Sequence, residues 1–367
     1  MQLFIGIMSG TSLDGVDVAL ASFEGLTAEN TACQLIATHF LPYPSALKLE
    51  LLALHEPTPN ELEAAILLGN RLAVLYADAV KQLLKSANKN ASEISAIGCH
   101  GQTIRHRPEL GFTLQIGNAA LLAELTNITV VADFRSRDIA AGGQGAPLVP
   151  AFHQAIFGSN QVNRALINIG GIANITYLGK DGTVLGFDSG PGNMLIDSWT
   201  KLKTGKDYDA DGTWAATGVV LDSLLSNMLA EPYFALPPPK STGRDLFNDY
   251  WLKQHQLYPH LRPQDVARTL VALTAQSIVD ALSKCGDVDE VYLCGGGAHN
   301  QLLVDALQAL LGAVTVRTTK ELGIDVDWVE AVAFAWLAKQ TIDNKPSNLP
   351  AVTGAKGLRV LGAIYPV

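Results

Sequence analysis

Asp188 is the carboxylate that the sequence marks most clearly as a candidate general base. It follows the apolar run 184–187 and precedes the glycine turn 190–192, which predicts a position at the end of a strand. An apolar neighbour such as Phe187 raises the pKa of a carboxylate, and a desolvated aspartate is a suitable proton acceptor. The structural alternative is that Asp188 caps a helix beginning at Pro191, a common role for aspartate.

Three glycine-rich turns carry the second chemical signal. They lie at residues 8–17 (MSGTSLDGVD), 188–193 (DSGPGN) and 294–298 (CGGGA), and each follows an apolar run typical of a strand. Glycine allows backbone N–H groups to approach an anion closely, and the hydroxyls of Thr11 and Ser12 add donors. One such turn alone is more often an ordinary tight turn, but three with acidic residues attached predict a phosphate-handling cleft.

Motifs and composition exclude several other classes of protein. None of the turns has the Gly-Lys-Ser/Thr of a Walker A loop or the G-x-G-x-x-G of a dinucleotide fold. A net charge of −9 argues against nucleic acid or an anionic membrane as partner. The four cysteines lack zinc-binding spacing, and neither a signal peptide nor a membrane span is visible. We therefore expect a cytoplasmic protein.

Hydrophobic periodicity divides the chain into two similar series of elements. In the first series, strands are predicted at 2–8, 16–23, 34–40, 96–99, 114–116 and 130–132, and helices at 59–86 and 119–125. In the second, strands are predicted at 164–168, 172–178, 184–187 and 290–294, and helices at 265–282 and 328–341. The repeated order indicates an internal duplication, each half being a sheet covered by helices.

The boundary between the halves is expected in the Gly- and Pro-rich segment 133–150, which gives domains 1–135 and 136–367. In such folds, ligands bind where the strand ends of both halves face each other. The run 237–239 (PPP) and the polar residues 240–245 after it predict a rigid loop within the second domain.

Several short segments, spread over nearly the whole chain, together resemble the motifs of a known family. They are residues 5–17, 100–103 (HGQT), 132–135 (ADFR), 142–147 (GGQGAP), 168–171 (NIGG), 187–193 and 294–297. With them, the chain resembles the superfamily of sugar kinases, actin and heat-shock chaperone ATPases, and within it the anhydro-N-acetylmuramic acid kinase family. The resemblance implies an α/β fold of two duplicated ribonuclease H-like (actin-like ATPase) domains with a nucleotide cleft between them.

The resemblance implies an enzyme of cell-wall (peptidoglycan) recycling that depends on ATP and Mg²⁺. Such an enzyme opens the 1,6-anhydro ring of 1,6-anhydro-N-acetylmuramic acid with water and phosphorylates the freed 6-oxygen, giving N-acetylmuramic acid 6-phosphate. Asp188 is then the base for the water, and Asp14 the metal ligand, since this chain has Met8 where many kinases of the superfamily place an aspartate. The implied ATP contacts are Gly10, Thr11, Ser12, Leu13, Asp14, Gly15, Val16, Asp17, Gly190, Gly192, Asn193, Gly295, Gly296 and Gly297.

Six further residues are implied as substrate contacts: His100, Gln102, Thr103, Arg135, Asn174 and Glu330. Arg135 or Arg137 suits the lactyl carboxylate of muramic acid, because arginine pairs bidentately with carboxylates. Structural alternatives stay open: a satisfied core histidine for His100, an interdomain salt bridge with Asp133 or Asp138 for the arginines, and a favourable helix N-terminal charge for Glu330.

Two other functions are weighed against this one. An actin- or chaperone-like ATPase has a conformational output, but the chain has no room for a large peptide-binding extension. A carbamoyltransferase of the same superfamily uses an H-x-x-x-H pair, and His100 and His106 have the wrong spacing. The expected partner is a small-molecule substrate, not nucleic acid or membrane, and a homodimer is left open.

Overall fold

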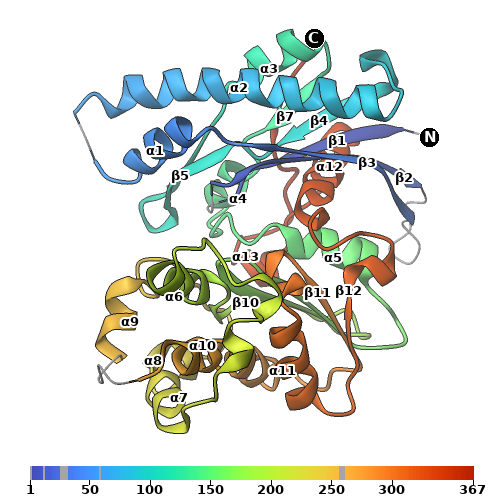
Figure 1. The fold of residues 1–367 in the computed structure, drawn as a ribbon. Helices are drawn as coiled ribbons and strands as arrows, with labels where there is room; N and C mark the ends of the chain where they lie inside the picture. Colours follow the sequence, from blue (N-terminus) through green and yellow to red (C-terminus); the bar gives the residue numbers. More distant parts are fainter. Residues whose placement is uncertain (1, 11–12, 25–31, 58, 256–260) are drawn as a thin grey trace. The chain divides into compact units, whose positions relative to one another are not determined.

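The computed structural model describes residues 2–10, 13–24, 32–57, 59–255 and 261–367. The chain divides into two compact units (Figure 1). Unit 1 comprises Met1–Phe157 and Trp328–Val367, and unit 2 comprises Gly158–Asp327. Within the described ranges, no helix is both long and apolar enough to cross a membrane.

Unit 1 is built on a six-stranded sheet in the order β13-β7-β4-β1-β2-β3. The first three strands form an antiparallel meander, and β4 and β7 continue the sheet in parallel with β1. The strands are β1 (Leu3–Met8), β2 (Gly15–Glu24), β3 (Ala32–Pro42), β4 (Ile94–Cys99), β7 (Val130–Ala132) and β13 (Ala363–Tyr365), and a separate ribbon pairs β5 (Gln102–Arg107) with β6 (Phe112–Ile116).

The two faces of this sheet pack against different helices because alternate residues of a strand point to opposite sides. Ile5 and Ile7 of β1 lie in one core with residues of α1, α2 and α3. On the opposite face, a Cβ atom at Gly6 would overlap the backbone of α12, and the same holds for Gly98 on β4. The helices are α1 (Ser45–Ala53), α2 (Glu61–Ser86), α3 (Ala119–Thr126), α4 (Ser136–Ala140), α5 (Val149–Phe157), α12 (Val329–Ile342) and α13 (Pro350–Thr353).

The end of the chain returns to unit 1, which the predicted division into 1–135 and 136–367 does not include. The strand β13 pairs with β7, with Ile364 opposite Val131, and α12 packs on the sheet of unit 1. The helices α4 and α5 also belong to unit 1. The division by contacts therefore differs from the predicted boundary, because these pairings join segments far apart in the sequence.

Unit 2 repeats the sheet of unit 1. Its order β10-β9-β8-β11-β12 has three antiparallel strands followed by two parallel ones, as in β3-β2-β1-β4-β7. The predicted duplication and the α/β fold with two ribonuclease H-like domains are thus confirmed. The elements are β8 (Arg164–Ile169), β9 (Ile172–Leu178), β10 (Val184–Pro191), β11 (Glu290–Cys294), β12 (Val316–Thr318), α6 (Met194–Thr204), α7 (Asp222–Leu229), α8 (Pro232–Ala235), α9 (Asp249–His255), α10 (Pro263–Leu282) and α11 (Gln301–Leu311).

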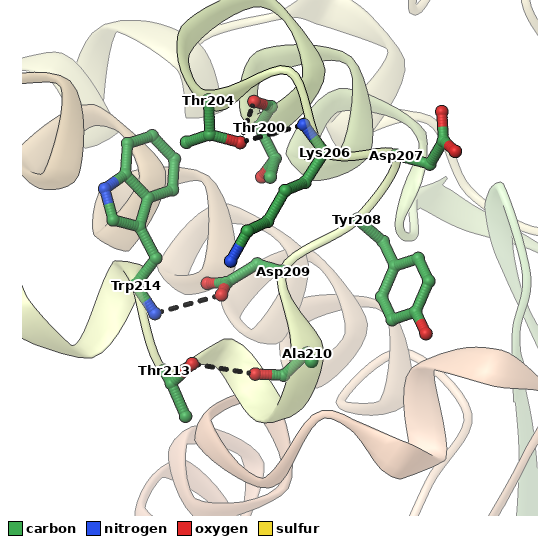
Figure 2. A pocket seen from close by; sticks show the side chains of 9 residues that line it. All are labelled: Thr200, Thr204, Lys206, Asp207, Tyr208, Asp209, Ala210, Thr213 and Trp214. Carbon is green, nitrogen blue, oxygen red and sulfur yellow. Dashed lines mark hydrogen bonds between the residues drawn. The ribbon is translucent and has the colours of Figure 1, made fainter.

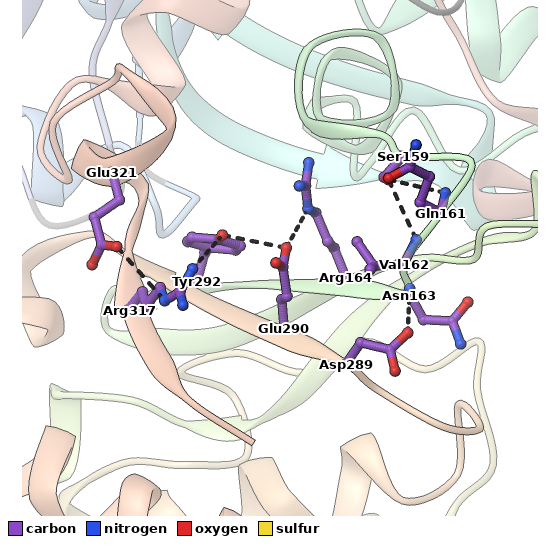
Figure 3. Close-up of polar contacts among 10 residues, drawn as sticks. All are labelled: Ser159, Gln161, Val162, Asn163, Arg164, Asp289, Glu290, Tyr292, Arg317 and Glu321. Atoms are coloured by element: carbon purple, nitrogen blue, oxygen red, sulfur yellow. Dashed lines mark hydrogen bonds and ion pairs between the residues drawn. The ribbon is translucent and has the colours of Figure 1, made fainter. Parts of the chain in front are cut away.

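The faces of the unit 2 sheet differ in polarity. Ile167, Ile175 and Phe187 lie in a core with residues of α6, α10 and α11. The other face carries a polar ladder, in which Arg164 pairs with Glu290 at 2.7 Å between Nε and Oε2 (Figure 3). Residues at alternate positions of β8, β9 and β10 therefore face away from the apolar core.

Candidate functional site

Asp188 lies on β10, and its carboxylate is held through one oxygen. Oδ2 accepts hydrogen bonds from the Ser241 hydroxyl and from the Thr242 backbone N–H, each at 3.0 Å. Burial raises the pKa of Asp188, and these two bonds together with the charge of Lys240 oppose that rise. The capping alternative is wrong, because α6 begins only at Met194.

A row of polar residues crosses the unit 2 sheet at the level of Asp188. Asp188 is opposite Asn174 on β9, Asn174 is opposite Asn168 on β8, and Asn168 is paired with Cys294 on β11. Opposite residues point to the same face. Within the described part of the chain, the side-chain amides of Asn168 and Asn174 have no hydrogen-bond partner. Asn168 was not among the predicted site residues, although it lies two residues before the Gly170–Gly171 turn.

Two of the three glycine turns lie together in unit 2. The Asn193 amide donates to the carbonyl of Ile169 at 3.2 Å, and a Cβ atom at Gly297 would lie 3.1 Å from the Asn193 Oδ1 atom. At Gly296 the nearest atom to such a Cβ is 3.9 Å away, so this side of the turn has room. The residues predicted to contact nucleotide, Gly190, Gly192, Asn193, Gly295, Gly296 and Gly297, thus gather at one end of the unit 2 sheet.

The backbone of the second turn differs from the prediction in one respect. The N–H groups of Gly192 and Asn193 donate to the carbonyls of Gly171 and Gly170, at 2.9 and 2.8 Å. They are engaged within the protein and are not free donors for phosphate, which corrects the expectation for these two groups. Glycine is needed at position 192 because a Cβ atom there would overlap the Gly170 carbonyl.

A pocket of about 440 Å³ in unit 2 is lined by the end of α6 and by residues of the segment that follows this helix (Figure 2). Its wall combines aromatic, hydroxyl and charged side chains, and Asp209 accepts from the Trp214 backbone N–H at 2.9 Å. The adjoining Gly212 packs so closely on Asn300 that a Cβ atom there would overlap the Asn300 side chain. None of the predicted site residues lines this pocket, which is formed by Thr200, Thr204, Lys206, Asp207, Tyr208, Asp209, Ala210, Thr213 and Trp214.

In unit 1, the first glycine turn joins β1 to β2. Thr11 and Ser12 lie outside the described residues. Leu13 is fully buried and has a left-handed backbone (φ 59°), and its N–H donates to the Gly10 carbonyl at 3.3 Å. Gly15, Val16 and Asp17 begin β2, and the Val16 side chain is fully buried. Apart from the acidic side chains of Asp14 and Asp17, these residues therefore offer a ligand only their backbone groups.

Gln102 holds this turn, a structural role that the sequence did not reveal, while its role as a substrate contact stays a prediction. Its side chain is fully buried and bonds the Ser9 hydroxyl and, at 3.2 Å, the Gly10 carbonyl. Ser9 in turn lies 2.6 Å from the Tyr43 hydroxyl. The neighbouring Thr103 accepts from the Gln115 amide at 3.2 Å on the β5–β6 ribbon.

His100 is buried in unit 1 and interacts with the half-buried Arg135, whose charge in turn acts on the half-buried Glu330. Nε2 of His100 accepts from Nη2 of Arg135 at 2.9 Å, and its Nδ1 lies 3.3 Å from the Ser9 carbonyl. Burial and the Arg135 charge lower the pKa of His100 to about 3, so the ring is neutral and satisfied, in line with the structural alternative. Burial raises the pKa of Glu330, an effect that Arg135 opposes.

The alternative role for the arginines, an interdomain salt bridge, is wrong. Arg135, Arg137, Asp133 and Asp138 all belong to unit 1, and the ion pairs found within the described ranges include none among them. Asp138 is fully buried and accepts from the Thr353 hydroxyl at 2.8 Å. Arg135 instead donates to the carbonyl of Gly145 at 2.8 Å.

Asp14, the predicted metal ligand, is an exposed carboxylate paired with Lys48 at 3.0 Å. Among the described residues, no three His, Cys, Asp or Glu side chains gather as a metal site. Mg²⁺ characteristically keeps several waters and binds one or two carboxylates together with substrate phosphates. A single accessible carboxylate at the turn fits that mode of binding.

Comparison with known proteins agrees with the resemblance seen in the motifs. The family model described as anhydro-N-acetylmuramic acid kinase matches residues 2–367. The enzyme of that name from Nitrosospira multiformis is 54% identical over 99% of this chain and 98% of its own length. That from Pseudomonas putida is 52% identical over 100% of both chains. The chain belongs to the anhydro-N-acetylmuramic acid kinase family and is a kinase that uses ATP.

Proposed function

We propose that this enzyme uses water to open the 1,6-anhydro ring of 1,6-anhydro-N-acetylmuramic acid and transfers the γ-phosphoryl group of ATP to the 6-oxygen. The product is N-acetylmuramic acid 6-phosphate, and the place of the reaction is cell-wall recycling in the cytoplasm. The observation that carries the proposal is the half-satisfied Asp188 carboxylate, within a chain that matches the family over its whole length.

Asp188 acts as the base for the attacking water. Its Oδ2 atom is occupied by two donors, whereas Oδ1 has no protein partner among the described residues. Burial raises the pKa of Asp188, which makes the carboxylate a stronger base than an exposed aspartate. As the water oxygen bonds to the anomeric carbon, its proton passes to Asp188 and the bond from that carbon to the 6-oxygen breaks.

The departing 6-oxygen needs an electrophile. Glycosidases usually supply a second carboxylic acid to protonate the leaving oxygen. Here the γ-phosphoryl group takes the place of that proton, so the 6-oxygen bonds phosphorus as the bond to ADP breaks. One essential carboxylate then suffices, because phosphoryl transfer requires positioning and charge stabilisation more than covalent help.

Arg135 is the proposed contact for the lactyl carboxylate, and Glu330, Asn174 and Thr103 for the sugar. Burial lowers the pKa of Arg135 to about 10, which leaves the guanidinium charged at neutral pH. His100 acts through Arg135, since its Nε2 fixes the guanidinium at 2.9 Å. The free amide of Asn174 lies beside Asp188 on the same sheet face.

The glycine turns are the proposed ATP contacts, including Thr11 and Ser12. Asp14, together with the phosphates, would hold Mg²⁺. The room at Gly296 and the exposed Asp14 carboxylate fit these roles. When bound, Mg²⁺ would neutralise charge on the transferring phosphoryl group. To hold the ion, the Asp14 carboxylate would give up its contact with Lys48.

Release of ADP tests the proposed activity against an ATPase with a conformational output. We expect ADP release to require 1,6-anhydro-N-acetylmuramic acid and to be slow with glucosamine or muramic acid. In ¹⁸O-labelled water, the label should enter the product at the anomeric carbon and be absent from its phosphate. Equal ADP release without the sugar, or label in the phosphate, would refute this reaction.

A further inference from the structure

The segment of residues 233–242, called here the anchoring segment, wraps around Asp188. It contains the end of α8 and the proline run 237–239. The Tyr233 hydroxyl donates to the Asp188 carbonyl at 2.7 Å, and the Asp188 N–H donates to the Lys240 carbonyl at 3.1 Å. With the bonds from Ser241 and Thr242, both the backbone and the carboxylate of Asp188 are bound to this one segment.

Two lysines hold the anchoring segment in place: Lys240 bonds within the segment, and Lys284 bonds to it from elsewhere in unit 2. The ammonium group of Lys240 donates to the Tyr233 carbonyl at 3.1 Å and lies 4.3 Å from the centre of the Tyr233 ring. Lys284, just after α10, donates to the Phe234 carbonyl at 2.7 Å. Because the Tyr233 and Phe234 carbonyls each accept a hydrogen bond from a lysine, the segment is fixed beside the Asp188 carboxylate.

We infer that Ser241 and Thr242 are positioning residues, which hold Oδ2 of Asp188 so that only Oδ1 faces the attacking water. This inference rests on the proposed role of Asp188. A carboxylate free to rotate would present either oxygen in many orientations, whereas two donors on one oxygen fix its plane. Donors to the ionised form also keep a buried carboxylate deprotonated, and therefore competent as a base, at lower pH.

Among the described residues, the titratable groups that interact with this carboxylate are Lys240 and Tyr233, and burial and the Asp188 charge raise the pKa of Tyr233. Lys240 acts on Asp188 directly, and Lys284 acts on Lys240. Burial lowers the pKa of Lys240 to about 8, so its titration affects the alkaline side of a pH profile. Glu330 is a second acid with a raised pKa, so the shift of the acidic side between the wild type and a Ser241 variant, rather than its position, reports on Asp188.

The test is the pH dependence of kcat for Ser241→Ala, Ser241→Thr and Asp188→Asn, assayed with ATP and 1,6-anhydro-N-acetylmuramic acid. Ser241→Ala removes one donor to the carboxylate. We expect its acidic limb to move to higher pH by about one unit and its kcat to fall about tenfold, with the KM for ATP unchanged. Ser241→Thr keeps the hydroxyl and should restore both. Ser159→Ala, which removes a hydroxyl 3.1 Å from the Gln161 N–H elsewhere in unit 2, is the matched control.

The outcomes separate this inference from the proposed function. If Asp188→Asn abolishes turnover while Ser241→Ala keeps the wild-type acidic limb, the positioning role is refuted and the base stands. The same conclusion follows if Ser241→Thr behaves like Ser241→Ala. If Asp188→Asn retains near-normal turnover, the proposed base itself is refuted.

Discussion

Gln102 belongs to a buried hydrogen-bond network that fixes the first glycine turn. Its amide bonds Ser9 and the Gly10 carbonyl, and the Tyr43 hydroxyl lies between Ser9 and the hydroxyl of Tyr76, 3.2 Å away. Buried polar groups that lose a partner are costly, because no water replaces the bond. The network therefore couples the β5 ribbon to the turn proposed to contact ATP.

Gln102→Leu keeps the buried volume but removes these bonds. We expect kcat/KM for ATP to fall about tenfold, since each lost buried hydrogen bond costs on the order of 1 kcal/mol, and KM for the sugar to stay unchanged. Steady-state kinetics with each substrate varied in turn measures both. Gln276→Leu, which removes an exposed amide bonded to Asp280 on α10, should have no effect. A selective rise in KM for the sugar would instead identify Gln102 as a substrate contact.

Single residues were predictable from the sequence only where one local pattern marks them. Asp188 lies between an apolar run and a glycine turn, so the sequence predicted its position on a strand next to the candidate functional site. Its partners Ser241 and Thr242 lie more than fifty positions away, and no local pattern connects them. Likewise, nothing in the HGQT motif distinguishes a substrate contact from the buried role that Gln102 has.

At the scale of elements, apolar periodicity predicted the central strands and the long helices. The predicted helices 59–86, 265–282 and 328–341 correspond to α2, α10 and α12, with ends shifted by one or two residues. The short strands β12 and β13 were not predicted, although the equally short β7 was, from its apolar run 130–132. Pairing with a neighbouring strand, which depends on the rest of the fold, defines them.

The close packing of α12 on the unit 1 sheet requires glycine at position 98. A Cβ atom at Gly98 would overlap the Phe334 carbonyl, so Gly98→Ala must push the helix, and Glu330 with it, away from the sheet. We expect unit 1 to lose about 1–3 kcal/mol of stability or more, measured as a lower unfolding midpoint in urea. Gly357→Ala, whose new methyl group would meet only the flexible end of Arg359, is the control. Equal midpoints for the two variants would contradict this packing.

At the scale of the whole molecule, the duplication was predictable, but the path of the chain was not. Two series of strands and helices could be counted from the sequence, whereas the return of residues 328–367 to unit 1 is a long-range pairing. Such pairings depend on which surfaces fit together in three dimensions. The predicted boundary consequently followed composition and missed the C-terminal segment.

Two buried histidines make unit 1 sensitive to acid. Burial lowers the pKa of His100 and of His153 to about 3, while an unfolded histidine titrates near 6.5. The unfolded chain thus binds more protons between these values, and stability falls as the pH drops below 6.5. We expect each histidine to cost about 2 kcal/mol at pH 5, seen as a lower urea midpoint than at pH 7.5. His153→Phe should reduce this difference, and a midpoint independent of pH would contradict the argument.

The proposed reaction depends on Asp188 as the base, and turnover of Asp188→Asn tests this role most directly. Asparagine keeps the size of the side chain and an oxygen for the Ser241 and Thr242 donors, but it cannot take the proton. We predict that kcat falls by about 10²–10⁴-fold, as is typical for the loss of a general base, with ATP affinity and the unfolding midpoint unchanged. Turnover within a few-fold of the wild-type enzyme would contradict the mechanism.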